Sequence, residues 1–292
     1  MLAIAMTRVA PSPSTAQTTA QADRMPHAPL FQQAAGDGNR LSPLIARDKS
    51  GRLYDYEPTG TGGFGARFDL GGGYANATAM AQVNISQNSG GTDLYVVIDD
   101  TLFYTSERGN DTKVLGTGWG AYNLLVSVGN MGGTGHPDLF ARDATGQLWF
   151  FQGKPDGSLA PRIRVGTGWN GMDELTGRGD YTGDGKADLV ARSAAGGLYI
   201  YPGTGSLTAD AIVGARLTVA APAGAASWKD YSALVSVGDN DGDGKPDLIG
   251  VEHTGVPADA LWLFKGTGKS AAPFASRRLI DSHSWGSYNL LF

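Results

Sequence analysis

The stretch "GTGWGAYNLLVSVGNMGGTGHPDLFARDATGQLWFFQG", residues 116–153, decides the fold because the chain repeats it. Close copies are "GTGWNGMDELTGRGDYTGDGKADLVARSAAGGLYIYPG" at 166–203 and "AASWKDYSALVSVGDNDGDGKPDLIG" at 225–250. A weaker copy is "GGGYANATAMAQVNISQNSGGTDLYVV" at 71–97. Self-similarity of this kind indicates a row or ring of equivalent supersecondary units.

The spacing inside each copy is constant. An aromatic residue precedes an aspartate by 19 residues in the pairs Tyr74 and Asp93, Trp119 and Asp138, Trp169 and Asp188, and Trp228 and Asp247. The distance between successive copies varies instead, from 45 to 59 residues. A fixed core with variable connections is typical of repeats whose insertions lie in loops.

Each copy predicts four short strands. In the copy at 116–165 they are Tyr122–Val128, Asp138–Arg142, Leu148–Gln152 and Arg162–Val165, with the turn sequence "RDATGQ" between the second and the third. The third strand carries an aromatic signature five times, as "LYDY" at 53–56, "LFY" at 102–104, "LWFF" at 148–151, "LYIY" at 198–201 and "LWLF" at 261–264. We therefore expect five units.

The two ends of the repeat region complement each other. The sequence finishes with "SWGSYNLLF" at 284–292, which reads as a first strand with none after it. The repeat region begins with "SPLIARDKSGRLYDY" at 42–56, which reads as a second and a third strand with no first. Pairing the two segments completes the fifth unit and removes exposed sheet edges. This predicts an all-β, five-bladed β-propeller closed by its C-terminal strand, with a two-domain β protein as the alternative.

Composition agrees with many short strands and tight turns. The 292 residues include 44 glycines, and only 17% are charged. The net charge of −5 and the lack of a basic stripe argue against nucleic acid as a partner. No apolar run is long enough to span a bilayer. The absence of cysteine excludes disulfides and cysteine-ligated zinc.

The first 36 residues differ from the rest. Residues 1–22 are rich in Ala, Ser and Thr, and Ala20-Gln21-Ala22 fits a signal-peptidase site, although a basic segment before it is missing. We expect residues 1–36 to be a remnant of a secretory leader or a disordered tail. The propeller is expected to occupy residues 37–292.

Two copies carry an unusually acidic loop between their first and second strands. The oxygen-bearing residues are Asp239, Asp241, Asp243 and Asp247 in one loop, and Asp180, Thr182, Asp184 and Asp188 in the other. Alternate side chains of a glycine-rich loop can converge on a Ca²⁺ ion, which takes six to eight oxygen ligands. Lys245 and Lys186 would contribute backbone carbonyls only.

The spacing of these loops excludes an EF-hand, which needs a glutamate at position twelve where this chain has Gly250 and Ala191. A solvated turn without metal is the alternative for both loops. The corresponding loops at 130–138 and 85–93 keep too few oxygen ligands to predict metal.

The acidic loop within such a unit resembles the FG-GAP/VCBS repeats of integrin-like propellers. "GTGW", "DGKADLVAR" and "LYIYPGTG" are similar to units of secreted bacterial FG-GAP repeat proteins. The resemblance covers about residues 37–292 and is most specific in the last three copies. It implies a propeller, Ca²⁺ in the two acidic loops, export, and an adhesive or carbohydrate-binding role.

Other recurring residues are expected to be structural. The tryptophans at 119, 169, 228 and 285 predict packing between blades, with a sugar platform as the alternative. Arg47, Arg142 and Arg192 are expected to hydrogen-bond nearby turns or carboxylates. Glu174 and Arg178 replace apolar residues of the innermost strand, so they line the predicted axial channel, where they contact either a ligand or water.

The sequence therefore predicts a secreted, monomeric, calcium-binding module that binds a glycan or an extracellular protein without catalysis. One alternative is a glycoside-active propeller enzyme, for which Asp173 with Glu174 is the acidic cluster we can name. Another is a repeat fragment of a larger secreted hydrolase.

Overall fold

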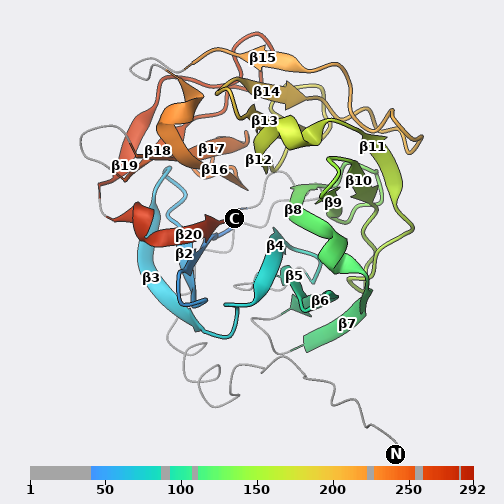
Figure 1. Cartoon of the computed structure of the whole chain (residues 1–292). Coiled ribbons are helices and arrows are strands. Elements are labelled where there is room, and N and C mark those ends of the chain that lie inside the picture. The colour runs from blue at the N-terminus through green and yellow to red at the C-terminus, as the bar shows by residue number, and fades with distance from the viewer. Residues whose placement is uncertain (1–40, 87–92, 107–110, 222–226, 254–258, 283) are drawn as a thin grey trace, which may run out of the picture.

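The chain forms five four-stranded antiparallel sheets arranged as blades around a central axis (Figure 1). This computed structural model describes residues 41–86, 93–106, 111–221, 227–253, 259–282 and 284–292. Residues 1–36, expected to be a leader remnant or a tail, lie outside the described residues. The predicted all-β, five-bladed propeller is confirmed.

The strands are grouped as follows. Blade 1 contains β20 (Tyr288–Leu291), β1 (Leu44–Asp48), β2 (Leu53–Pro58) and β3 (Phe64–Gly71); blade 2 contains β4 (Ala77–Val83), β5 (Asp93–Ile98), β6 (Thr101–Ser106) and β7 (Asp111–Thr117); blade 3 contains β8 (Tyr122–Gly129), β9 (Asp138–Asp143), β10 (Leu148–Phe151) and β11 (Ile163–Gly166); blade 4 contains β12 (Met172–Thr176), β13 (Leu189–Ser193), β14 (Leu198–Tyr201) and β15 (Leu217–Val219); blade 5 contains β16 (Tyr231–Gly238), β17 (Asp247–Glu252), β18 (Ala260–Phe264) and β19 (Arg278–Asp281).

Blade 1 closes the ring with strands from both ends of the described chain. In the antiparallel pair of β1 and β20, Ala46 lies opposite Leu291 and Arg47 opposite Leu290. Ile45 and Phe292 exchange backbone hydrogen bonds, with N···O distances of 2.9 and 3.0 Å. The pairing inferred from the two incomplete ends of the repeat is confirmed.

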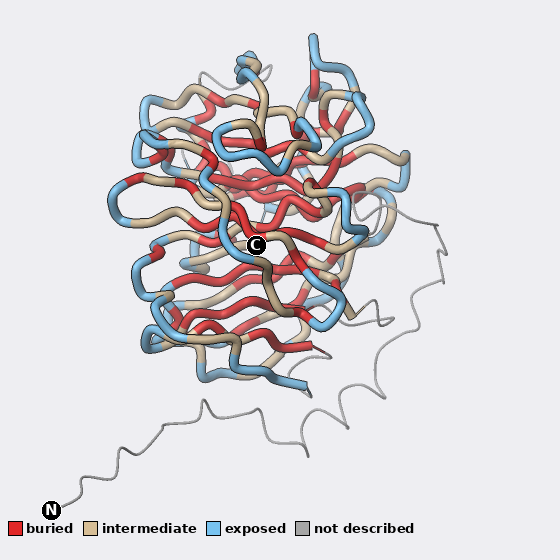
Figure 2. The backbone as a smooth tube through the Cα atoms, turned by 90° about the vertical axis from the view of Figure 1, so that its right-hand side faces the viewer, coloured by how far each residue is buried: buried red, intermediate tan, exposed pale blue. Residues whose placement is uncertain are grey.

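The core lies in the gaps between blades and consists of five apolar clusters, each shared by two neighbouring blades. Side chains alternate between the two faces of a strand, so one strand contributes to two gaps. In β9, Leu139 and Ala141 pack toward blade 2, whereas Phe140 packs toward blade 4. Both faces of the second strands are therefore buried, which is why these strands are largely apolar. Figure 2 shows that buried segments run through the interior of the molecule and that exposed segments lie at its periphery.

A single turn of 3₁₀ helix, begun by a tryptophan, precedes the innermost strand of four blades. These turns are η3 (Trp119–Ala121), η4 (Trp169–Gly171), η5 (Trp228–Asp230) and η6 (Trp285–Ser287). Each tryptophan packs on the last aromatic residue of its own blade's third strand; Trp169, for example, lies 4.8 Å from Tyr201 between ring centroids. Trp169 also belongs to the cluster between blades 3 and 4. The predicted packing role is confirmed.

Three arginines on the second strands connect neighbouring blades. Nη1 of Arg142 donates to the carbonyls of Trp169 and Met172, at 3.2 and 2.6 Å. Arg47 and Arg192 make the same pair of bonds to the turn before the next blade, so their predicted structural role is confirmed. A guanidinium is well suited to this task, because its donors are fixed in one plane.

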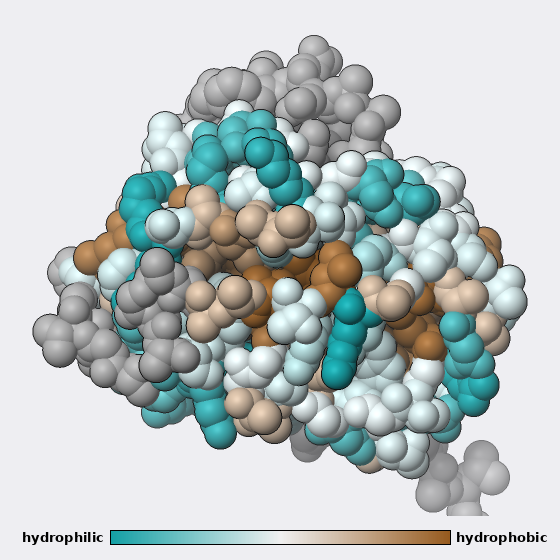
Figure 3. All heavy atoms as spheres, turned by 90° about the horizontal axis from the view of Figure 1, so that it is seen from above, coloured by the Kyte–Doolittle hydropathy of each residue, from teal (hydrophilic) through white to brown (hydrophobic). Residues whose placement is uncertain are grey.

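The surface of the molecule at the β15 rim is a mosaic of polar and apolar side chains (Figure 3). Among the described residues, the large apolar side chains classed as exposed are Val114, Leu207 and Leu279.

Candidate metal centre

An aspartate at the start of the second strand organises the loop before it in four blades. These residues are Asp93, Asp138, Asp188 and Asp247, and each is fully buried. In blade 3, the carboxylate of Asp138 accepts hydrogen bonds from the backbone N–H groups of Met131, Gly132 and Gly153, at 2.8, 2.6 and 2.9 Å. One side chain thus ties the loop to the end of the third strand. Pro43 occupies the corresponding position in blade 1.

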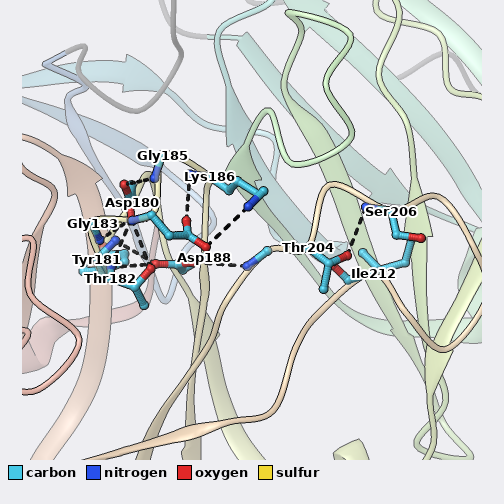
Figure 4. Close-up of polar contacts among 12 residues, drawn as sticks. Asp180, Tyr181, Thr182, Gly183, Gly185, Lys186, Asp188, Thr204, Ser206 and Ile212 are labelled. Atoms are coloured by element: carbon cyan, nitrogen blue, oxygen red, sulfur yellow. Dashed lines mark hydrogen bonds and ion pairs between the residues drawn. The ribbon is translucent and has the colours of Figure 1, made fainter.

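The blade 4 loop, residues 180–188, is folded around two of its own carboxylates (Figure 4). Counting Asp180 as position 1, Asp188 is position 9. Asp180 accepts from the backbone N–H groups of Gly183 and Gly185, both at 2.6 Å. Asp188 accepts from Tyr181 and from Gly203, at 2.8 and 3.1 Å. These bonds curl the loop and bring its acidic side chains to one side.

Three carboxylates converge in this loop. Asp180, Asp184 and Asp188 each have an oxygen within 4.8 Å of the others. Two oxygens that share a Ca²⁺ ion at about 2.3–2.6 Å lie at most about twice that distance apart. The separation and the all-oxygen donor set therefore fit a hard divalent cation. The hydroxyl of Thr182, another predicted ligand, donates to Asp180 at 3.3 Å, beside this cluster.

The blade 5 loop, residues 239–247, has the same backbone path. Asp239 accepts from Gly242 and Gly244, both at 2.7 Å, in the way that Asp180 does in blade 4. The converging carboxylates here are Asp239, Asp241 and Asp247, at positions 1, 3 and 9. Oδ1 of Asp241 is buried and has no hydrogen-bond partner among the described residues.

Asp243, at position 5 of the blade 5 loop, is not part of the converging set. Its Oδ2 lies 3.1 Å from Nζ of Lys265, a residue just beyond β18. The same ammonium lies 2.5 Å from Oδ2 of Asp241. Lys265 was not among the residues predicted from the sequence. The alignment of "LWLFKG" at 261–266 with "LYIYPG" at 198–203 puts Lys265 opposite Pro202, but it does not show which loop the lysine contacts.

Burial changes the acidity of the loop aspartates. It raises the pKa of Asp188 to about 6, and the charge of Asp180 acts in the same direction. Burial likewise raises the pKa of Asp247 to about 7, with contributions from Asp241 and Asp239. Backbone N–H donors oppose both shifts without cancelling them. A cation seated among these carboxylates would stabilise their charged forms.

Within the described part of the chain, the loops of blades 4 and 5 are the two places where three metal-ligating side chains converge. Lys186 and Lys245 lie at the rims of these loops, with Nζ 3.6 and 3.7 Å from Asp184 and Asp243. That the backbone carbonyls of Lys186 and Lys245 are metal ligands stays a prediction.

The repeat units themselves can now be identified, because residues 131–191 and 180–250 match the family model of the FG-GAP-like repeat. These segments are FG-GAP-like repeats. The two matches overlap at residues 180–191, and both include the acidic loop of blade 4. The second match also includes the blade 5 loop, so the FG-GAP-like repeats are carried on a five-bladed propeller.

Solved structures similar to this chain share little sequence with it. A nidogen–laminin complex matches at 12% identity with a TM-score of 0.43, covering 87% of this chain and 84% of that one. A lectin from Burkholderia pseudomallei matches at 16% identity with a TM-score of 0.48, covering 85% of this chain and 68% of that one. These likenesses carry no conclusion about what the FG-GAP-like repeats bind here. No curated protein matches the chain.

Arg178, two residues beyond the end of β12, contacts other protein groups. Nη1 of Arg178, which is 4% exposed, donates to Gln82 of blade 2 at 2.9 Å. Gln82 in turn donates to the carbonyl of Pro43 in blade 1, so a polar chain joins three of the five blades. The side chain of Arg178 is therefore buried and reaches from blade 4 to blade 2.

Asp173 and Glu174, the acidic pair considered for catalysis, both interact with Arg192. Nε of Arg192 donates to Asp173 at 2.9 Å, and its Nη2 lies 3.9 Å from Glu174. Glu174 also accepts a 3.4 Å hydrogen bond from the backbone N–H of Leu234 in blade 5. Glu174 therefore contacts blade 5, whereas Asp173 is bound to Arg192 of its own blade.

Replacing Asp138 tests the structural role of the buried aspartate in a blade without a metal cluster. Asp138→Ala leaves two loop N–H groups and that of Gly153 without their acceptor and should lower the free energy of unfolding by about 3 kcal/mol or more. The melting temperature should fall by about 6–12 °C. Asp156→Ala, in an exposed turn of the same blade, is the control and should change stability by about 0.5 kcal/mol or less. Equal effects of the two substitutions would contradict the assignment.

Glu174 should make stability depend on pH. Burial raises its pKa to about 7, whereas an unfolded glutamate titrates near about 4.3. Between these values the folded state binds more protons than the unfolded state, so the free energy of unfolding falls as pH rises. Glu174→Gln removes this loss. Its melting temperature should equal that of the wild type at pH 4.5 and exceed it at pH 8 by about 2–6 °C, or about 1–2 kcal/mol. A difference independent of pH would refute this account.

Proposed function

We propose that this protein is a secreted, calcium-binding propeller that acts as a non-catalytic binding or adhesion module for a glycan or an extracellular protein. The observation that carries the proposal is the convergence of Asp180, Asp184 and Asp188 within 4.8 Å in a loop curled by its own hydrogen bonds. Residues 1–36 serve as the leader in this proposal, and residues 37–292 as the working domain.

Calcium is the cation that suits this loop. The donors are carboxylates, and in this proposal the hydroxyl of Thr182 and the carbonyl of Lys186 complete the set. Ca²⁺ accepts such flexible, all-oxygen surroundings, whereas Mg²⁺ demands a near-ideal octahedron. When bound, the ion supplies positive charge that offsets the repulsion among the carboxylates. A dissociation constant for calcium in the millimolar range, which is typical of extracellular modules, would be sufficient for binding outside the cell.

A binding role fits the repetition of surface chemistry around the ring. In four blades an arginine in the last strand, or directly before it, stacks on an aromatic ring of the third strand. The pairs are Arg67 on Tyr54, Arg162 on Trp149, Arg216 on Tyr199 and Arg277 on Trp262, at 3.9–4.5 Å from guanidinium carbon to ring centroid. Equivalent arginine and aromatic groups on several blades suit a ligand that repeats the same chemical group. Several weak contacts to such a ligand together give a higher overall affinity than one contact does.

A non-catalytic role fits the contacts of the acidic pair nearest the axis. A glycosidase needs two carboxyl groups free to reach the scissile bond. Asp173 and Glu174 instead pair with Arg192. Among the described residues no helix is long and apolar enough to cross a membrane.

Calcium should stabilise the protein through the blade 4 loop. At a hundredfold excess over Kd, one ion adds about 2.7 kcal/mol, or about 5–10 °C in melting temperature for a domain of this size. Asp184→Asn should abolish most of this increment and change the melting temperature little in EGTA, because Asp184 accepts only one loop hydrogen bond. Asp210→Asn, at an exposed acid of the same blade, is the matched control. A wild-type melting temperature that calcium does not change would contradict the proposed calcium binding.

The ligand class is tested on a glycan array with the labelled full chain, in calcium and in EGTA. We expect selective binding to one group of glycans, reduced by EGTA and by Asp184→Asn. A parallel binding assay on extracellular matrix proteins covers the protein alternative. Absence of binding to both panels in calcium would contradict the proposed function.

A further inference from the structure

Lys265 occupies the place of a cation in the blade 5 loop. Its Nζ donates to Oδ2 of Asp241 at 2.5 Å and lies 3.1 Å from Oδ2 of Asp243. The side chain of Asp241 is 12% exposed and that of Asp243 is 23% exposed, so both contacts are partly shielded from water. The ammonium reaches the loop from the end of β18, outside the loop itself.

Blades 3 and 4 have no ammonium at this position. Lys265 directly precedes Gly266, whose N–H donates to Asp247. In blade 4 the residue before the equivalent Gly203 is Pro202, which carries no charge. In blade 3 it is Gln152, whose Nε2 donates to the carbonyl of Gly132 at 3.0 Å. The fold therefore accepts a proline, a glutamine or a lysine here, and only the lysine brings positive charge.

The ammonium coincides with a difference between the two acidic loops. Position 5 belongs to the converging carboxylates in blade 4, as Asp184, but not in blade 5, where Asp243 lies against Lys265. Lys186 and Lys245 occupy equivalent rim positions in the two loops, so they cannot account for this difference. The blade 5 loop as it stands does not fit a divalent ion that uses both Asp241 and Asp243.

We propose that Lys265 is a built-in counter-ion that neutralises the blade 5 loop and competes with divalent cations for it. The tethered ammonium is present at high effective concentration, so an ion must displace it before Asp241 and Asp243 become free. The side chain is 44% exposed, which leaves room for it to swing away. The carboxylates of the blade 5 loop are then neutralised by this lysine at low calcium, whereas those of the blade 4 loop gain a comparable counter-ion only when calcium binds.

The inference rests on the proposed calcium binding only because the blade 4 loop is the site with which the blade 5 loop is compared. Calcium binding to the full chain, measured by isothermal titration calorimetry, separates the two ideas. Wild type should bind one ion tightly. Lys265→Gln introduces the glutamine that blade 3 has at the equivalent position. This variant should bind a second ion at least tenfold more tightly than the wild-type blade 5 loop does. Lys265→Arg keeps the charge and should behave as the wild type.

Lys245→Gln is the matched control, because it removes the same charge from the rim of the same loop and should create no second site. In EGTA, Lys265→Gln should melt below Lys245→Gln, and calcium should reverse the order. Two equally tight ions in the wild type, or no gain of ion binding in Lys265→Gln, would overturn the proposal. No ion in the wild type but one in Lys265→Gln would support the role of Lys265 and reject calcium binding in blade 4.

Discussion

One buried carboxylate per loop is the interaction on which four of the five blades depend. The aspartate at position 9 accepts backbone N–H groups from its own loop and, in blades 3, 4 and 5, from the glycine after the third strand. Such a loop has too few apolar side chains to fix its own path, so the backbone must find acceptors inside the protein. Because blade 3 keeps this arrangement without a metal cluster, the aspartate serves the fold first, and the candidate metal site is an addition to it.

The additions are side chains at positions 1, 3 and 5, and they separate the blades functionally. Once the loop is curled, a carboxylate at position 1 accepts further N–H groups, as Asp180 and Asp239 do. A third carboxylate then adds negative charge that a positively charged group must balance. In blade 4 the ammonium at the loop is that of Lys186 at the rim, 3.6 Å from Asp184, whereas blade 5 has Lys265 in addition to the equivalent Lys245. The same backbone thus supports a purely structural turn, a candidate ion site and a self-neutralised site.

The repeat made the fold predictable from the sequence. Constant spacing between the tryptophan and the aspartate defined the unit, and the complementary ends revealed the closure, because both depend on local pattern. The candidate ligands could be read in the same way, since loop positions 1 to 9 are contiguous. Lys265 and the bond between Arg178 and Gln82 could not, because they join residues of different loops or different blades. Their partners are set by the arrangement of the blades, which no single unit encodes.

The pairing of β1 with β20 also has a kinetic consequence. Arg47 and Asn289, which are bonded to each other in blade 1, are separated by 242 residues. At a synthesis rate of about 5–20 residues per second, the inner edge of β1 waits roughly 10–50 s for its partner strand. During that interval the growing chain presents an unpaired edge to any other strand nearby. Contacts so distant in sequence also slow folding, so formation of this last ladder is expected to set the time at which the ring becomes resistant to proteases and to intermolecular association.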